Sequence, residues 1–151
     1  MEIRIAPASE ADFSWCARVM ATTDPWLTLG RDFDACLARV RRSELELLVA
    51  RADGQALGFV LLHPTGLAGS PYVASIAVAA EARGSGVGTA LMRFAESHYP
   101  EARHIFLCVS SFNEGARRLY ERLGYKVVGE LPGYVIEGAS EILMHKRLVR
   151  A

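Results

Sequence analysis

Apolar residues recur along the chain with two periods, one typical of strands and one typical of helices. Alternating or continuous apolar runs mark seven segments as strands, and apolar positions three or four residues apart mark four segments as helices. The predicted strands are Glu2–Ala6, Glu44–Arg51, Gln55–His63, Tyr72–Ala79, His104–Ser110, Tyr125–Val128 (with a continuation toward Ile136) and Ser140–Leu148. The predicted helices are Ser9–Ala21, Asp32–Arg42, Gly86–Tyr99 and Asn113–Leu123. The element order is therefore β-α-α-β-β-β-α-β-α-β-β.

Turn residues separate these elements. Asp53-Gly54 is a typical two-residue hairpin turn and predicts an antiparallel pair of strands around it. Thr22–Gly30 predicts a loop with an unusually apolar Trp26-Leu27 at its centre. Pro64–Pro71 holds two glycines and two prolines, and it too is predicted to be a loop or wide turn.

The central strand–helix–strand unit decides the topology. The two apolar strands within Tyr72–Ser110 are joined by a helix, and a right-handed crossover of this kind makes them parallel neighbours. The flanking hairpins are antiparallel. We therefore expect one α/β domain over residues 1–151, with a mixed, mostly antiparallel sheet and helices packed on it.

Composition narrows the classes of protein. The 17 basic and 17 acidic residues cancel, whereas a nucleic-acid binder usually carries a basic excess. No apolar run approaches the length of a membrane span, and the N-terminus has no signal-peptide core. Cys16, Cys36 and Cys108 lie far apart, which favours reduced thiols, and the histidines lack metal-ligand spacing. We expect a cytoplasmic protein without a metal, nucleic-acid or membrane partner.

The sharpest local feature is the run Arg83-Gly84-Ser85-Gly86-Val87-Gly88, between a buried strand and a helix. Glycines there let successive backbone N–H groups point at one place beside the positive end of the helix dipole, which is typical of a phosphate site. The alternative interpretation is a turn whose glycines only permit close packing. The run is not a Walker A loop, because no Gly-Lys-Ser/Thr follows, and its spacing fits a dinucleotide fingerprint poorly.

A second feature is the helix from Asn113 to Tyr120, where Asn113 suits an N-cap and Tyr120 suits a core position. Both features together change the picture. The segments Ile76-Ala77-Val78, Arg83-x-x-Gly86-x-Gly88, Asn113 with Tyr120 seven residues later, and Leu123-Gly124-Tyr125 resemble the GNAT superfamily of acyl-CoA-dependent N-acetyltransferases. The predicted element order is similar to the fold of that superfamily over nearly the whole chain, and this resemblance implies helices on both faces of the sheet.

The resemblance implies a site built from backbone and side chains. In the superfamily, the strand matching Ile76–Val78 pairs with the pantetheine arm of acetyl-CoA and donates an N–H to the thioester oxygen. The segment matching Gly84–Thr89 holds the pyrophosphate, and Tyr120 matches the tyrosine that protonates the departing CoA thiolate. The implied cofactor-binding residues are Ile76, Ala77, Val78, Arg83, Gly84, Ser85, Gly86, Val87, Gly88, Thr89 and Asn113.

One departure concerns the base that deprotonates the acceptor amine. The N-terminal acetyltransferases of ribosomal proteins in this superfamily have a glutamate where this chain has Cys108, so the match to protein N-terminus specificity is incomplete. Cys108 is interpreted as a small buried residue, with a covalent acetyl-cysteine as the alternative. The remaining candidates for base, or for holding a water that acts as one, are Glu81, His63, Glu137, Glu141 and Ser75.

The acceptor side is expected at Trp26-Leu27 and Pro132-Gly133-Tyr134, which match the superfamily's acceptor walls, although Trp26 equally suits a core cap. The predicted activity is acetyl transfer to a primary amine of a small molecule or protein, and a homodimer is considered as the assembly. The alternatives are a non-catalytic acyl-CoA-binding or sensing domain, a protein N-terminal acetyltransferase and, more distantly, a nucleotide-binding domain.

Overall fold

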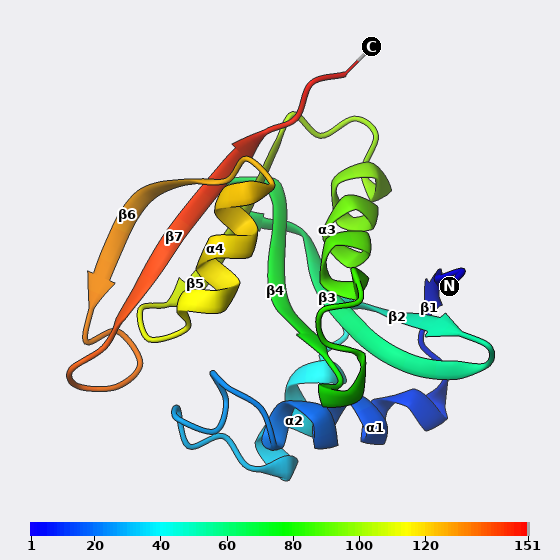
Figure 1. Cartoon of the computed structure of the whole chain (residues 1–151). Helices are drawn as coiled ribbons and strands as arrows, with labels where there is room; N and C mark the ends of the chain where they lie inside the picture. The colour runs from blue at the N-terminus through cyan, green and yellow to red at the C-terminus, as the bar shows by residue number, and fades with distance from the viewer. Residues whose placement is uncertain (151) are drawn as a thin grey trace.

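A single seven-stranded sheet runs through the computed structural model, which describes residues 1–150 (Figure 1). The strands are β1 (Arg4–Pro7), β2 (Glu46–Ala52), β3 (Gln55–Leu67), β4 (Ser70–Val78), β5 (His104–Ser110), β6 (Lys126–Pro132) and β7 (Ser140–Arg147). The helices are α1 (Glu10–Ala21), α2 (Phe33–Val40), α3 (Val87–His98) and α4 (Glu114–Arg122), with a short 3-10 turn η1 (Ala80–Ala82) before α3. The predicted element order is confirmed.

The strands lie in the order β1-β2-β3-β4-β5-β7-β6. Every neighbouring pair is antiparallel except β4–β5, which is parallel and joined through α3. The mixed, mostly antiparallel sheet with one central parallel pair is the predicted fold class. Among residues 1–150, no helix is both long enough and apolar enough to cross a membrane.

The predicted loop over Pro64–Pro71 is wrong. β3 continues to Leu67 and β4 begins at Ser70, and these two residues are paired across a two-residue turn. Ala68 and Gly69 in that turn have φ of 52° and 82°, the left-handed backbone that a tight hairpin requires. The β3–β4 register is also interrupted between His63 and Leu67, and such an irregularity accommodates a proline within a strand.

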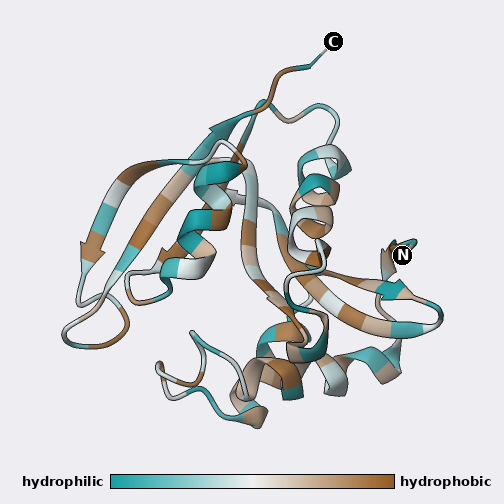
Figure 2. Cartoon of the chain, in the orientation of Figure 1, coloured by the Kyte–Doolittle hydropathy of each residue, from teal (hydrophilic) through white to brown (hydrophobic). Residues whose placement is uncertain are grey.

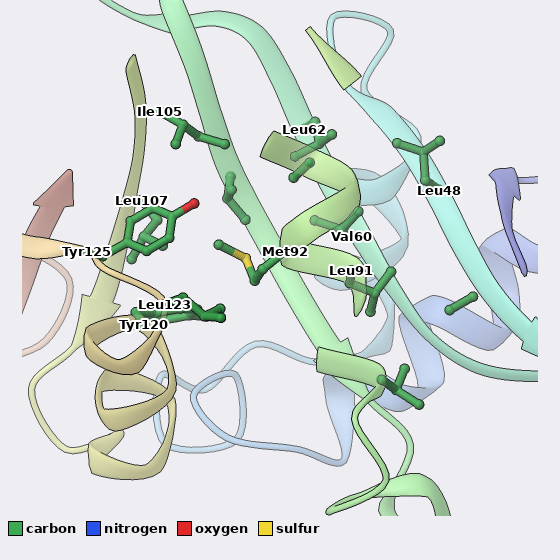
Figure 3. Close-up of a cluster of buried hydrophobic side chains, with 14 of the residues drawn as sticks. Leu48, Val60, Leu62, Leu91, Met92, Ile105, Leu107, Tyr120, Leu123 and Tyr125 are labelled. Carbon is green, nitrogen blue, oxygen red and sulfur yellow. The ribbon is translucent and has the colours of Figure 1, made fainter. Parts of the chain in front are cut away.

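Helices cover both faces of the sheet, as predicted, because neighbouring residues of the inner strands point to opposite sides. Phe59 and Leu61 of β3 pack with α1 and α2, whereas Val60 and Leu62 pack with α3 and α4. Figure 2 shows apolar and polar bands along each helix, and the larger apolar residues of the helices are those that pack in the two clusters. The α3–α4 cluster appears in Figure 3, where Met92 lies near the sheet strands and the end of α4.

Gly58 of β3 allows the start of α3 to lie close to β4. A Cβ atom at this position would stand 2.7 Å from the carbonyl oxygen of Ala77 and 3.1 Å from Cγ1 of Val87. Only a residue without a side chain fits this distance. The close packing brings the glycine-rich segment before α3 beside the C-terminal end of β4.

Candidate active site

The two parallel strands at the centre of the sheet separate after a short contact. β4 pairs with β5 only at Tyr72 and Val73, although both strands continue beyond this point. The β3–β4 register shifts at the same place, which leaves Ala74 as an extra residue in β4. A bulge of this kind bends a strand, so the backbone of Ala74–Val78 has no strand beside it toward β5. An extended ligand can pair with such an edge.

The glycine-rich segment forms the second part of the site. Gly84 and Gly86 have φ of 78° and 88°, and no atom lies within 4 Å of where their Cβ atoms would be, so backbone conformation rather than space calls for glycine. The N–H groups from Gly84 to Thr89 donate to no backbone carbonyl within residues 1–150. They precede or begin α3, where the helix dipole is positive. This arrangement fits a phosphate group.

Two side chains of this segment, those of Ser85 and Arg83, make hydrogen bonds to other parts of the chain. The Ser85 hydroxyl donates to the carbonyl oxygen of Ala82, so Ser85 offers a ligand its N–H rather than its side chain. Nη2 of Arg83 lies 3.5 Å from Oγ1 of Thr23, in the segment that follows α1. Arg83 therefore reaches across the opening beside the free N–H groups, where a cation favours an anionic ligand.

Two cavities adjoin this part of the sheet. The loop cavity, of about 900 Å³, is lined by Ile76–Val78 of β4, by the glycine-rich segment and by α4. The strand cavity, of about 490 Å³, lies between β4 and β5 and reaches α2. The residues that line both are Ile76, Asn113, Ala116 and Tyr120. All the predicted cofactor-binding residues except Ser85 line at least one of the two cavities.

Tyr120 lies where the two cavities meet. The residue is only 6% exposed, and its ring makes an edge-to-face contact with Tyr125, with centroids 6.2 Å apart (Figure 3). Within residues 1–150, every side-chain polar atom sealed from solvent has a hydrogen-bond partner. Because no protein partner is found for the Tyr120 hydroxyl, this group must open into the cavities. Burial raises the pKa of Tyr120, so the phenol holds its proton at neutral pH.

Asn113 begins α4 and also faces both cavities. Its Oδ1 atom accepts a hydrogen bond from the N–H of Ala116, at 3.4 Å, as an N-cap does. The cap uses only the oxygen of the amide. The Nδ2 group is therefore left to donate to a ligand at the junction of the cavities.

The candidate proton acceptors differ in whether they line one of the two cavities. Glu141 of β7 and Ser75 of β4 line the strand cavity, whereas Glu81, His63 and Glu137 line neither cavity. Oε2 of Glu141 accepts a hydrogen bond from the Ser110 hydroxyl at 2.7 Å, which holds the carboxylate in place. Glu141 is thus the one carboxylate among these candidates that lines either cavity.

Cys108 and Tyr72 lie on neighbouring strands in the wall of the strand cavity. Burial raises the pKa of the Cys108 thiol and the pKa of the Tyr72 phenol, and both groups stay protonated. A protonated thiol is a weak nucleophile. The arrangement gives no support to a covalent acetyl-cysteine.

The structure brings only part of the predicted acceptor walls to the strand cavity: Trp26 and Tyr134 line it, Leu27 lines the loop cavity, and Pro132 and Gly133 line neither. Trp26 is 8% exposed and packs in the α1–α2 core, as a core cap does. It also lines the strand cavity, so its place in an acceptor wall stays a prediction. Leu27 and Tyr134 are 56% and 70% exposed and line the loop cavity and the strand cavity respectively. Among the residues that the structure describes, no cluster of three or more metal-binding side chains is found.

Sequence reasoning missed two charged residues of the strand cavity, Arg31 and Arg39. Arg39 of α2 donates from Nε to the Ser75 hydroxyl at 2.8 Å and from Nη2 to the Ala74 carbonyl at 2.6 Å. The neighbours Cys36 and Val40 are buried, which hints at the inward face of α2, but the partner strand lies 35 residues away along the chain.

Comparison of the sequence with known protein families identifies the family to which this fold and site belong. The chain belongs to the acetyltransferase (GNAT) family, whose model matches residues 10–125. It is 38% identical over 102 residues to an uncharacterized N-acetyltransferase of Methanocaldococcus jannaschii, covering 66% of this chain and 64% of the relative. It is 31% identical over 119 residues to an N-alpha-acetyltransferase of Sulfurisphaera tokodaii, covering 70% and 71%. The match thus spans about two thirds of each relative's length.

Solved structures agree on the fold. An aminoglycoside 6'-N-acetyltransferase complexed with coenzyme A superimposes with a TM-score of 0.79 at 18% identity, covering 98% of each chain. A nourseothricin acetyltransferase is 31% identical, with a TM-score of 0.65, covering 71% of this chain and 67% of that one.

Proposed function

We propose that this protein transfers an acetyl group from acetyl-CoA to a primary amine. The observation that carries the proposal is the junction of two cavities at Tyr120, one bordered by free backbone N–H groups and the other by Glu141. Membership of the acetyltransferase family supports it. The reaction needs two substrates in contact, and the junction provides a place where they meet beside a proton donor.

Acetyl-CoA occupies the loop cavity in this proposal. The N–H groups of Gly84–Thr89 bind the pyrophosphate together with Arg83, and the open edge of Ile76–Val78 pairs with the pantetheine arm. Asn113 donates to the cofactor from Nδ2 at the junction. The fit is favourable, because these donors lack protein acceptors and the loop cavity, at about 900 Å³, is large enough for an extended ligand.

The acceptor amine enters from the strand cavity and attacks the thioester carbonyl. A carbon–nitrogen bond forms, and a β4 backbone N–H near Val78 stabilises the negative oxygen. The carbon–sulfur bond then breaks, and Tyr120 donates its phenolic proton to the CoA sulfur. Glu141 takes one proton from the acceptor ammonium group before the attack, directly or through water held by Ser75. The protonated nitrogen of the intermediate releases its second proton to solvent as the amide forms. The phenolate regains a proton from solvent after CoA leaves.

The acceptor is a small-molecule or protein amine. The similarity to an N-alpha-acetyltransferase supports a protein N-terminus as the acceptor. Against this, Cys108 stands where the ribosomal-protein enzymes carry a glutamate. The free thiols at Cys16, Cys36 and Cys108 favour a reducing compartment such as the cytoplasm. A purely acyl-CoA-binding domain is the competing function, and it gives no reason for an open, protonated hydroxyl at the junction.

The direct test measures thiol release from acetyl-CoA over a panel of primary amines. We expect at least one amine to raise release well above hydrolysis, and Glu141→Gln to lower kcat/KM about 10²-fold or more. Glu137→Gln is the matched control, because this exposed glutamate lines neither cavity and should leave turnover unchanged. Tight acetyl-CoA binding without acceptor-dependent release would instead favour the binding domain. Equal rates for both variants would remove Glu141 from the mechanism.

A further inference from the structure

One wall of the strand cavity is positively charged. Arg39 of α2 and Arg31, just before this helix, both line the cavity, and neither forms an ion pair with a carboxylate within residues 1–150. Two further arginines at the end of α2 differ in this respect. Arg41 pairs with Glu10 at 3.0 Å, and Arg42 pairs with Glu44 at 3.1 Å. The unpaired charges are thus the two that face the cavity.

The Arg39 guanidinium is held in a fixed orientation against the bulge of β4. Nε donates to the Ser75 hydroxyl and Nη2 donates to the Ala74 carbonyl, so two of its five N–H groups are used. The other three have no acceptor in the described part of the chain. Burial lowers the pKa of Arg39, and Arg31 and Arg42 act in the same direction. A partly desolvated cation without a counter-charge is unfavourable, and an anion supplied by a ligand would relieve this.

The rest of the cavity carries little to balance these cations. Glu141 is the one carboxylate that lines it, and it already accepts a hydrogen bond from Ser110. Tyr72 and Cys108 stay neutral, because burial raises the pKa of each. An acceptor with only an ammonium group would enter a cavity with two guanidinium groups and a single carboxylate. Like charges at close range disfavour that acceptor.

An acceptor with both charges fits this arrangement. We propose that the amine acetylated here also carries a carboxylate, which Arg39 binds while the ammonium group lies toward Glu141. Arg31 is exposed at the cavity wall and draws the anion in. This inference rests on the proposed acetyl transfer and deepens it. A cavity of about 490 Å³ suits a small amino acid or the acidic first residue of a peptide.

Arg39 also links α2 to β4, so a change in stability alone would not establish the proposal. The discriminating readout is the preference between two acceptors of the same size. A purely structural arginine affects a carboxylate and its amide equally. A carboxylate-binding arginine affects only the acid, and mainly through KM.

The experiment compares thiol release for matched acceptor pairs: β-alanine with β-alaninamide, L-alanine with L-alaninamide, and C-terminally amidated tripeptides that begin with Asp or Asn. For the free amino acids or for the peptides, the wild-type kcat/KM should be at least about tenfold higher for the acid than for its amide partner. Which of the two kinds of pair shows this preference identifies the acceptor as a free amino acid or as a peptide. Arg39→Gln should bring the ratio close to one by raising KM for the acid. Arg39→Lys should keep part of the preference, since it keeps the charge.

Arg41→Gln is the matched control and should keep both the preference and the rates, because Arg41 pairs with Glu10 outside the cavity. Acetyl-CoA affinity and Tm, measured for every variant, should stay near wild type for Arg39→Lys and Arg41→Gln. The inference would be overturned if the wild-type protein acetylated amides as fast as acids. It would also be overturned if a folded Arg39→Gln variant kept the preference for acids. Neither result would contradict acetyl transfer itself. Failure to bind acetyl-CoA would overturn both.

Discussion

Removing the Tyr120 hydroxyl separates chemistry from stability. In Tyr120→Phe the ring and its contact with Tyr125 remain, and no hydrogen bond to the protein is lost. The free energy of unfolding should therefore change by less than about 0.5 kcal/mol. Turnover should fall about 10- to 100-fold, the low end for a general acid, because a thiolate is a fair leaving group that needs modest help. The affinity for acetyl-CoA should be unchanged.

The neighbouring Tyr125 provides the opposite control. Its hydroxyl donates to Oε2 of Glu96 at 3.0 Å, inside the core and away from both cavities. Tyr125→Phe should lower the free energy of unfolding by about 1.5–3 kcal/mol, the cost of a hydrogen bond to a charged group. For a chain of this length that corresponds to a Tm lower by about 3–12 °C. Turnover below this Tm should remain near wild type.

The assay measures thiol release under saturating acetyl-CoA, together with thermal unfolding of both variants. Tyr120→Phe should lose turnover and keep the wild-type Tm, whereas Tyr125→Phe should have a lower Tm and keep turnover. Wild-type turnover in Tyr120→Phe would show that another group protonates the leaving thiolate. A Tm drop equal to that of Tyr125→Phe would show that the Tyr120 hydroxyl is bonded within the core.

Three further predictions concern the site and the scaffold. Cys108→Ser should keep turnover within about threefold of wild type, because a protonated thiol adds no nucleophile; a loss of activity with a retained fold would revive the acetyl-cysteine. Gly58→Ala should lower the free energy of unfolding by about 1–3 kcal/mol in urea titrations, since its Cβ would stand 2.7 Å from the Ala77 carbonyl oxygen. Burial acts to raise the pKa of Asp12, but hydrogen bonds, including one from Arg51, outweigh burial and bring the pKa below 3.8. The ionised Asp12 therefore stabilises the folded protein fully above about pH 4, and this contribution is lost as the pH falls through the lowered pKa. Asp12→Asn should flatten the fall in Tm below pH 4, and an unchanged slope would contradict this.

The sequence was sufficient for the parts of the site that depend on local pattern. The strand Ile76–Val78, the glycines before α3 and the spacing from Asn113 to Tyr120 are each a local pattern, and the right-handed crossover through α3 determines how β4 and β5 lie beside each other. The structure places Tyr120 and Asn113 where the two cavities meet, and their roles there stay predictions.

Other features depend on contacts that no local pattern encodes. The hairpin at Ala68-Gly69 could not be predicted, because the prolines and glycines around it are equally typical of a loop. Its two strands are stabilised by pairing with β2 and β5, which no local pattern shows. Arg39 is separated by 35 and 36 residues from the two groups it bonds, so its place in the strand cavity follows only from the packing of α2 on β4. The bulge at Ala74, which parts β4 from β5, is likewise a property of the register.

The central claim is that the free N–H groups at Gly84–Thr89 and the open edge of β4 bind acetyl-CoA. Thermal unfolding with acetyl-CoA, CoA, ATP or NAD tests it most directly. A ligand at about one hundred times its Kd adds roughly 2.7 kcal/mol, which raises Tm by about 5–11 °C for a chain of this length. We predict this rise with acetyl-CoA and CoA and no comparable rise with ATP or NAD. No rise with millimolar acetyl-CoA would mean that the glycine-rich segment is only a turn, and would contradict the account.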